Sequence, residues 1–171
     1  MKELQVQNAG LVLLHPFLPA LFARTGYMEQ GKFKNEAAAV KGVFLLQYIA
    51  TGQEPTTGSA ANEELGLNKV LCGLPLSKQC QPMGVLSEEE KQAGRSLLEA
   101  MLKSWAEMSR SSEEILRESF LKRSGRLKDK KGSRLLIVEK NGHTDPLLQR
   151  LPWAFNPVRH GWMKEPVQVD W

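Results

Sequence analysis

The stretch that decides the fold is Asn8–Gly26, which reads NAGLVLLHPFLPALFARTG. Its only polar side chains are those of Asn8, His15, Arg24 and Thr25. Because no side of such a segment can face water, we predict that it is buried, as one helix or as two short helical pieces. A transmembrane helix needs about 20 clean apolar residues. Pro16 and Pro19 interrupt this stretch, so it is not a standard membrane span.

The composition is that of a protein with a packed core. Of the 171 residues, 42% are hydrophobic and 25% are charged, which excludes global disorder. The length fits one globular domain over residues 1–171. The chain has two cysteines, Cys72 and Cys80. Free thiols are the simpler interpretation, and a disulfide stays open because it depends on their separation in space.

Capping residues and hydrophobic periodicity predict the helices. Asn8 is the expected N-cap of the opening helix, and Asn35 that of the next. Two Ser-x-x-Glu capping boxes start later helices, and Ile115 is expected to point inward in the last of them. The four helices expected after the opening stretch are Glu36–Thr51, Glu63–Gly73 (capped by Ser59 or Asn62), 88 to about 108 (capped by Ser87), and a fifth helix through Arg123 (capped by Ser111).

Two stretches near the C-terminus alternate between apolar and polar side chains or are rich in β-branched residues. They are Leu135–Glu139 and Val167–Trp171, and we expect them to pair as antiparallel strands, with Leu4–Gln7 as a third strand. We interpret Arg126–Ser133 as a basic loop. The expected fold class is mainly α (α+β), a compact bundle of about five helices with a small antiparallel β-sheet formed by the C-terminal and N-terminal segments.

The sequence offers no recognisable catalytic chemistry. His15, His143 and His160 lie far apart in the chain and none has a partner at metal-ligand spacing. Nucleophile elbows and glycine-rich phosphate loops are absent from the sequence. We therefore predict no catalytic, cofactor-binding or metal-binding residues, no cofactor, and a protein that is not an enzyme.

Positive charge concentrates in one segment, from Phe120 to Arg134. Seven cations lie there against a single acid, Asp129. Such a cluster suits an acidic protein partner as well as nucleic acid, but few aromatic residues stand nearby to stack on bases. The candidate contact residues in this segment are Lys122, Arg123, Arg126, Lys128, Lys130, Lys131 and Arg134.

Aromatic residues gather in the last part of the chain, at Trp153, Phe155, Trp162 and Trp171. One interpretation is a satellite core beneath the small sheet. The other is a partner interface, because Trp and Phe are enriched at the centres of interfaces. The same residues can serve both, so they complete our set of candidate contact residues.

Five blocks, in order, carry a resemblance to a known family. They are NAGLVLLHPFLPALFARTG at Asn8–Gly26, FLLQYIATG at Phe44–Gly52, LNKVLCGLPL at Leu67–Leu76, FLKRSGRL at Phe120–Leu127, and LPW…WM at Leu151–Met163. The chain resembles the tape measure proteins of contractile injection systems, which are phage-tail-like particles with a sheath around an inner tube on a baseplate.

The resemblance implies a structural, non-enzymatic role, in setting tube length or starting tube assembly. The implied partners are proteins of the particle, in the tube, baseplate or cap. The implied location is the cytoplasm during assembly, and then a released extracellular particle. Family members are usually much longer, so this sequence is either a fragment or a short homologue.

A ruler needs an extended segment, at about 1.5 Å per helical residue, which short helices folded together do not supply. We therefore expect an anchoring domain. The alternative is a helical nucleic-acid-binding or adaptor module that uses Lys122–Arg134. The oligomeric state stays open.

Overall fold

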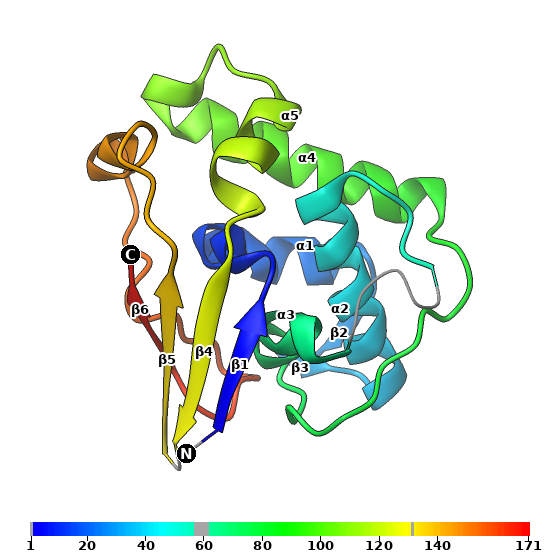
Figure 1. Ribbon diagram of the computed structural model, residues 1–171. Helices are drawn as coiled ribbons and strands as arrows, with labels where there is room; N and C mark the ends of the chain where they lie inside the picture. The colour runs from blue at the N-terminus through cyan, green and yellow to red at the C-terminus, as the bar shows by residue number, and fades with distance from the viewer. Residues whose placement is uncertain (1, 57–61, 131) are drawn as a thin grey trace.

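The computed structural model describes residues 2–56, 62–130 and 132–171, and shows helices packed against one face of a four-stranded sheet (Figure 1). The sheet has the order β1-β4-β5-β6. Its strands are β1 (Lys2–Val6), β4 (Gly125–Lys130), β5 (Ser133–Val138) and β6 (Val167–Asp170). A separate hairpin pairs β2 (Met28–Glu29) with β3 (Lys32–Phe33). The α+β class is confirmed, but the sheet is larger than the small one predicted.

The sheet is mixed. β4 runs antiparallel to both β1 and β5, whereas β6 runs parallel to β5, with Leu136 opposite Val169. The predicted antiparallel pairing of 135–139 with 167–171 is therefore wrong. The connection over 139–166 is long enough to carry the chain back to the starting end of β5, and parallel strands need such a crossover. The predicted N-terminal strand is present, but its neighbour is β4.

The basic segment 126–133 is not a loop. It contains most of β4, the turn at Gly132 and the start of β5. Leu127 is fully buried opposite Leu136, between exposed Arg126 and half-buried Lys128. The sequence did not predict β4 as a strand because its outward positions are nearly all charged, and the segment therefore has the polar composition of a loop.

The opening stretch forms the centre of the core, as predicted. It consists of two pieces, the 3-10 helix η1 (Ala9–Phe17) and α1 (Leu18–Arg24), and residues 11–14 are completely buried. Asn8 occupies the N-cap position of η1 as predicted, but its side chain makes no capping hydrogen bond, and its amide donates instead to Gln47 Oε1 at 3.0 Å. At Gly10 the backbone approaches η4 so closely that a Cβ atom would lie 1.9 Å from the Phe120 carbonyl oxygen.

The remaining helices surround this centre. They are α2 (Glu36–Thr51), η2 (Asn62–Leu65), α3 (Gly66–Leu71), α4 (Glu88–Ser104), η3 (Ala106–Met108), α5 (Glu113–Leu116), the π-helical turn η4 (Arg117–Leu121) and η5 (Asp145–Arg150). Two predicted caps are confirmed. The Asn35 side chain accepts a hydrogen bond from the Ala38 amide, and Ser87 and Glu90 form a capping box. The alternative cap Ser59 lies outside the described residues.

Three details of the fourth and fifth helices differ from the prediction. α4 ends at Ser104 and gives way to η3 before Met108. The cap of α5 is Ser112, whose hydroxyl accepts from the Ile115 amide, so Ser111 is not the cap. Ile115 is 50% exposed and does not point inward.

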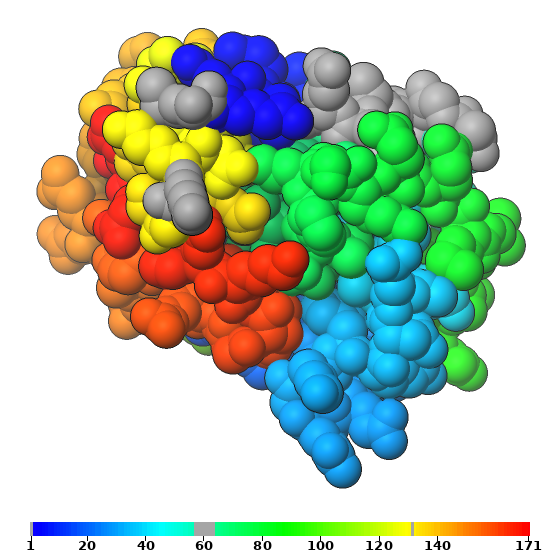
Figure 2. Space-filling model, turned by 90° about the horizontal axis from the view of Figure 1, so that it is seen from below, coloured from blue at the N-terminus to red at the C-terminus, as the bar shows by residue number. Residues whose placement is uncertain are grey.

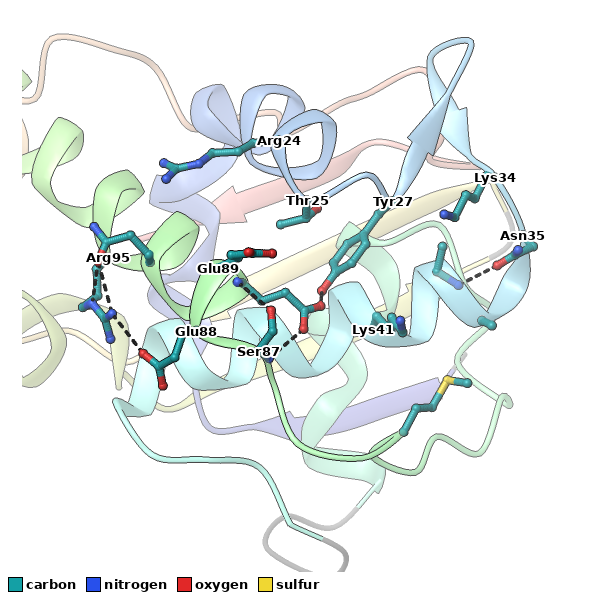
Figure 3. Close-up of a pocket in the computed structure, with 15 residues that line it drawn as sticks. Arg24, Thr25, Tyr27, Lys34, Asn35, Lys41, Ser87, Glu88, Glu89 and Arg95 are labelled. Atoms are coloured by element: carbon teal, nitrogen blue, oxygen red, sulfur yellow. Dashed lines mark hydrogen bonds and ion pairs between the residues drawn. The ribbon is translucent and has the colours of Figure 1, made fainter.

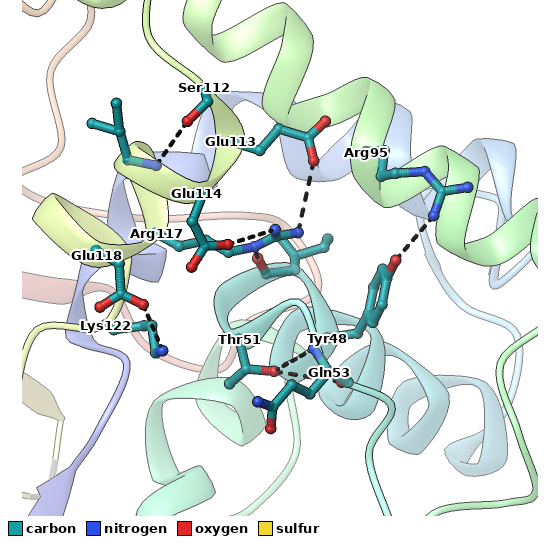
Figure 4. A network of polar contacts seen from close by, with 12 residues as sticks. Tyr48, Thr51, Gln53, Arg95, Ser112, Glu113, Glu114, Arg117, Glu118 and Lys122 are labelled. Atoms are coloured by element: carbon teal, nitrogen blue, oxygen red, sulfur yellow. Dashed lines mark hydrogen bonds and ion pairs between the residues drawn. The ribbon is translucent and has the colours of Figure 1, made fainter.

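The C-terminal end of α2 is closed by a buried arginine from η4. Arg117 is 7% exposed, and its Nε donates to the Ile49 carbonyl oxygen at 2.9 Å (Figure 4). Its terminal nitrogens lie 3.9 Å from Glu113 and 3.8 Å from Glu114. Cations are favourable at helix C-termini, so this contact stabilises the end of α2 and joins η4 to it.

Candidate functional site

Arg123 links the two regions that the sequence singled out, the basic segment and the aromatic cluster. It is 8% exposed. Its guanidinium donates to Asp145 Oδ1 and to the Glu139 carbonyl oxygen, both at 2.8 Å. The guanidinium carbon also lies 5.2 Å from the centre of the Trp171 ring. Its charge is used inside the fold, so Arg123 is not part of an accessible basic surface.

Three of the other six predicted cations form ion pairs with acids, one of them distant in the chain and the other two only four or five residues away. Arg126 contacts Glu3 at 3.1 Å, Lys122 contacts Glu118 at 2.9 Å, and Arg134 contacts Asp129 at 2.9 Å. Lys128 and Lys130 form no ion pair with any residue in the described ranges, and Lys131 lies outside those ranges. The net positive charge that this segment presents is therefore smaller than its seven cations suggest.

The outer face of the sheet holds the cations that stay accessible. The register places Arg126 beside Ile137 and Lys128 beside Leu135 on this face, and Lys130 follows along β4. Leu135 and Ile137 are half-buried, whereas their neighbours Leu136 and Val138 point to the core. No described helix lies in front of these strands in Figure 1. Figure 2 shows β4 and β5 (yellow) between the N-terminal strand (blue) and the C-terminal segment (red).

The tryptophans bind the C-terminal segment to the helices. Trp153 Nε1 donates to the Leu13 carbonyl oxygen at 2.9 Å, and Trp162 Nε1 donates to the Leu71 carbonyl oxygen at 2.8 Å. Phe155 packs edge-on against Trp171 at 5.7 Å. All four aromatic side chains are half-buried, so they serve the packing of the fold, and their role in partner contact stays a prediction.

A cleft of about 900 Å³ lies between the end of α1, the residues that flank the β2–β3 hairpin and the starts of α2 and α4 (Figure 3). The Tyr27 hydroxyl donates to Glu90 Oε2 across its floor. Burial and the Glu90 carboxylate both raise the pKa of Tyr27. This cleft was not predicted from the sequence, because its walls come from four separate segments. The available signal was that two capped helices, at Asn35 and Ser87, begin with charged side chains nearby.

A comparison with protein families shows to which family the chain belongs. The family described as contractile injection system tape measure protein matches residues 1–171, which is the whole chain. The chain belongs to this tape measure family. The resemblance drawn from the five sequence blocks is therefore confirmed. Searches of curated proteins and of solved structures returned no match.

This tape measure family chain carries two histidines that meet in space. The rings of His15 and His160 lie 6.0 Å apart, and His160 stacks on Trp162. Burial lowers the pKa of both histidines. No group of three metal-ligating side chains occurs among the described residues.

The structure of this tape measure family chain also shows the state of the two cysteines and whether any described helix could span a membrane. Cys72 and Cys80 are free thiols, and both are buried. Burial raises the pKa of Cys72 well above its usual value. Within the described ranges, no helix combines the length and the apolar character that crossing a bilayer requires.

Proposed function

We propose that this chain is a non-enzymatic assembly component of a contractile injection system. In this proposal the chain anchors to a tube, baseplate or cap protein through the outer face of its sheet. The observation that supports this most is the pairing of Leu135 and Ile137 with the cations of β4 on a face that no described helix covers. Apolar centres with a charged rim are typical of protein interfaces.

The charge of this face favours an acidic partner. Arg126 is partly offset by Glu3. Lys128 lies opposite Glu3 in the register but forms no ion pair with it, and Lys130 forms none with any described residue. Complementary charge speeds association and orients the partner more than it adds affinity. Anchoring therefore depends on the aliphatic pair for strength and on the lysines for orientation.

Anchoring suits this compact structure better than measuring. The longest helix, α4, has 17 residues, and spans only about 25 Å at 1.5 Å per residue. We place the protein in the cytoplasm during assembly and in the released particle afterwards, as one globular domain.

The test is a binding assay with purified tube, baseplate and cap proteins. Ile137→Glu and Lys128→Glu should each weaken capture by one of these proteins about tenfold or more. Lys103→Glu, which makes the same charge change on exposed α4, is the matched control and should bind normally. Undiminished capture by the Ile137→Glu and Lys128→Glu variants would reject the sheet face as the anchoring surface.

A second candidate is nucleic-acid binding, favoured by the cations at alternate positions of β4. Binding through Arg126, Lys128 and Lys130 to phosphates must weaken steeply with salt, in proportion to the number of contacts. A gel-shift titration with single- and double-stranded DNA at low and high salt separates this function from anchoring. Binding that persists in high salt, or does not occur in low salt, excludes it.

A further inference from the structure

The cleft continues into apolar surface at both ends. On one side, Arg24 also lines an apolar groove between α1 and α4, whose walls include Ala20, Ala93 and Ala100. On the other side, Met83 lines both the cleft and a smaller hollow beneath Val85. The three hollows therefore adjoin one another, and we call them together the trough.

Within this trough three cations form no ion pair with any described residue, whereas Arg95 and two of the three acids already have partners. Arg24, Lys34 and Lys41 are exposed and form no ion pair with a described residue. By contrast, two of the three acids at the start of α4 have partners, and Glu89 forms no ion pair with a described residue. Glu90 accepts from the Ser87 amide and from Tyr27, while Glu88 lies 3.9 Å from Lys91 and 3.8 Å from Arg95.

The exposed apolar side chains also point to this trough. In the described chain, three large hydrophobic residues are exposed, and two of them are Met83, at 55%, and Val85, at 83%. Met83 lines the cleft, and both line the smaller hollow next to it. Exposed apolar patches beside polar surface are typical of interaction sites.

We propose that the trough binds an acidic peptide segment of another protein, with carboxylates in the cleft and apolar side chains in the flanking grooves. Arg24, Lys34 and Lys41 supply the charge complementarity. The volume of about 900 Å³ falls within the usual range for ligand sites, about 300–1,000 Å³. The starts of α2 and α4, two long helices, add partial positive charge to the same cleft.

The rest of the lining favours a peptide over nucleic acid. Glu88 and Glu89 form one wall of the cleft, and two adjacent carboxylates repel a continuous polyanion. An acidic peptide avoids this repulsion because its charges can be confined to the opposite wall. The apolar groove between α1 and α4 offers space for aliphatic side chains and has one charged residue, Arg24, in its lining.

This site does not depend on the proposed anchoring surface. None of the residues that line the cleft belongs to the four-stranded sheet. A substitution on the sheet therefore leaves the cleft intact, and a substitution in the cleft leaves the sheet intact. A chain with both sites can hold two different partners at once.

The test is fluorescence polarisation of the full chain with labelled synthetic peptides. The main probe has a run of Glu residues followed by a pair of Leu residues. One control peptide replaces Glu with Lys, and another replaces Leu with Ser. We expect binding of the first peptide, no binding of the Lys peptide, and affinity weakened about tenfold for the Ser peptide.

Variants on both parts of the trough complete the test. Lys34→Glu combined with Lys41→Glu should abolish binding of the acidic peptide, and Ala20→Trp, which fills the apolar groove, should weaken it about tenfold. Lys103→Glu, at an exposed position of α4 that lines none of the three hollows, is the matched control and should leave it unchanged. Circular dichroism of each variant reports whether it folds.

Three results would overturn the proposal. One is an acidic peptide that does not bind the wild-type chain. Another is unchanged affinity in the folded Lys34→Glu, Lys41→Glu variant. The third is binding of an oligonucleotide or of tripolyphosphate that competes with the peptide and exceeds it in affinity, since that would assign the cations to phosphate. Loss of capture in the sheet variants alone would leave this proposal standing.

Discussion

The guanidinium of Arg123 lies 5.2 Å from the centre of the Trp171 ring while it donates hydrogen bonds to Asp145 and to the Glu139 carbonyl oxygen. One buried side chain thus joins the end of η4 to β5, to η5 and to the C-terminal strand. These contacts need a planar cation with several donors, which arginine supplies and lysine does not.

Arg123→Lys should therefore destabilise the protein by about 2–4 kcal/mol, because several buried acceptors lose their donors. Urea unfolding followed by circular dichroism measures this change. Lys122→Gln is the control. Its ion pair with Glu118 is exposed, so it should shift stability by less than about 0.5 kcal/mol. Equal effects of the two variants would show that Arg123 is not a structural tie.

Trp→Phe substitutions should separate the tryptophans by their hydrogen bonds. Trp153→Phe and Trp162→Phe each remove a donor from a backbone carbonyl, whereas the Trp171 indole nitrogen has no partner among the described residues. The first two should cost about 1–2 kcal/mol more than Trp171→Phe, as read from thermal or urea unfolding. A larger loss for Trp171→Phe would contradict this order.

Gly10→Ala should unfold the protein or destabilise it by more than about 3 kcal/mol, since the added Cβ meets backbone atoms of η4 that cannot rotate away. The nearest are the Phe120 carbonyl oxygen at 1.9 Å and Leu121 Cα at 2.6 Å. At Gly142 a Cβ meets no atom within 4 Å, so Gly142→Ala should stay within about 0.5 kcal/mol of wild type. Expression and differential scanning calorimetry compare the two.

Stability should fall as the pH is lowered through the range in which histidine titrates. In the native state the pKa values of His15 and His160 lie below the usual 6.5, so the unfolded chain binds more protons near and below that pH. The stability is complete above the unfolded pKa and is lost as the pH falls towards the native values.

The measurement for this pH effect is the urea midpoint between about pH 7.5 and pH 5.5, a window that brackets the unfolded histidine pKa. His160→Gln should make the midpoint depend less on pH. His143→Gln, at an exposed position, should leave the slope unchanged. A midpoint that rises on acidification would contradict the burial of these two rings.

Local signals predicted the helices well. The bounds of Glu36–Thr51, the capping box at Ser87 and the buried pair of pieces in Asn8–Gly26 depend on side chains within a few residues of one another. Pairing in the sheet depends on contacts between residues more than a hundred positions apart, such as Leu4 with Leu127. No pattern within either strand specifies that partner, and the charges of β4 concealed its alternation.

The candidate site was predicted only in part for a related reason. The sequence shows how many cations a segment carries, but an acid that neutralises one of them can come from a distant part of the chain, as Glu3 does for Arg126. The same holds for the cleft, whose unpaired cations Arg24, Lys34 and Lys41 belong to segments that look unremarkable one at a time.

The strand order also fixes when the anchoring surface can exist. β1 is synthesised first, but its neighbour β4 begins at Gly125, and β6 at Val167. During translation η1, α1 and the helices that follow can pack together before β4 is available to pair with β1, because folding proceeds from the N-terminus as the chain emerges. The sheet is complete only after β6 has been synthesised, so a nascent chain cannot form all four strands before Asp170 has left the ribosome.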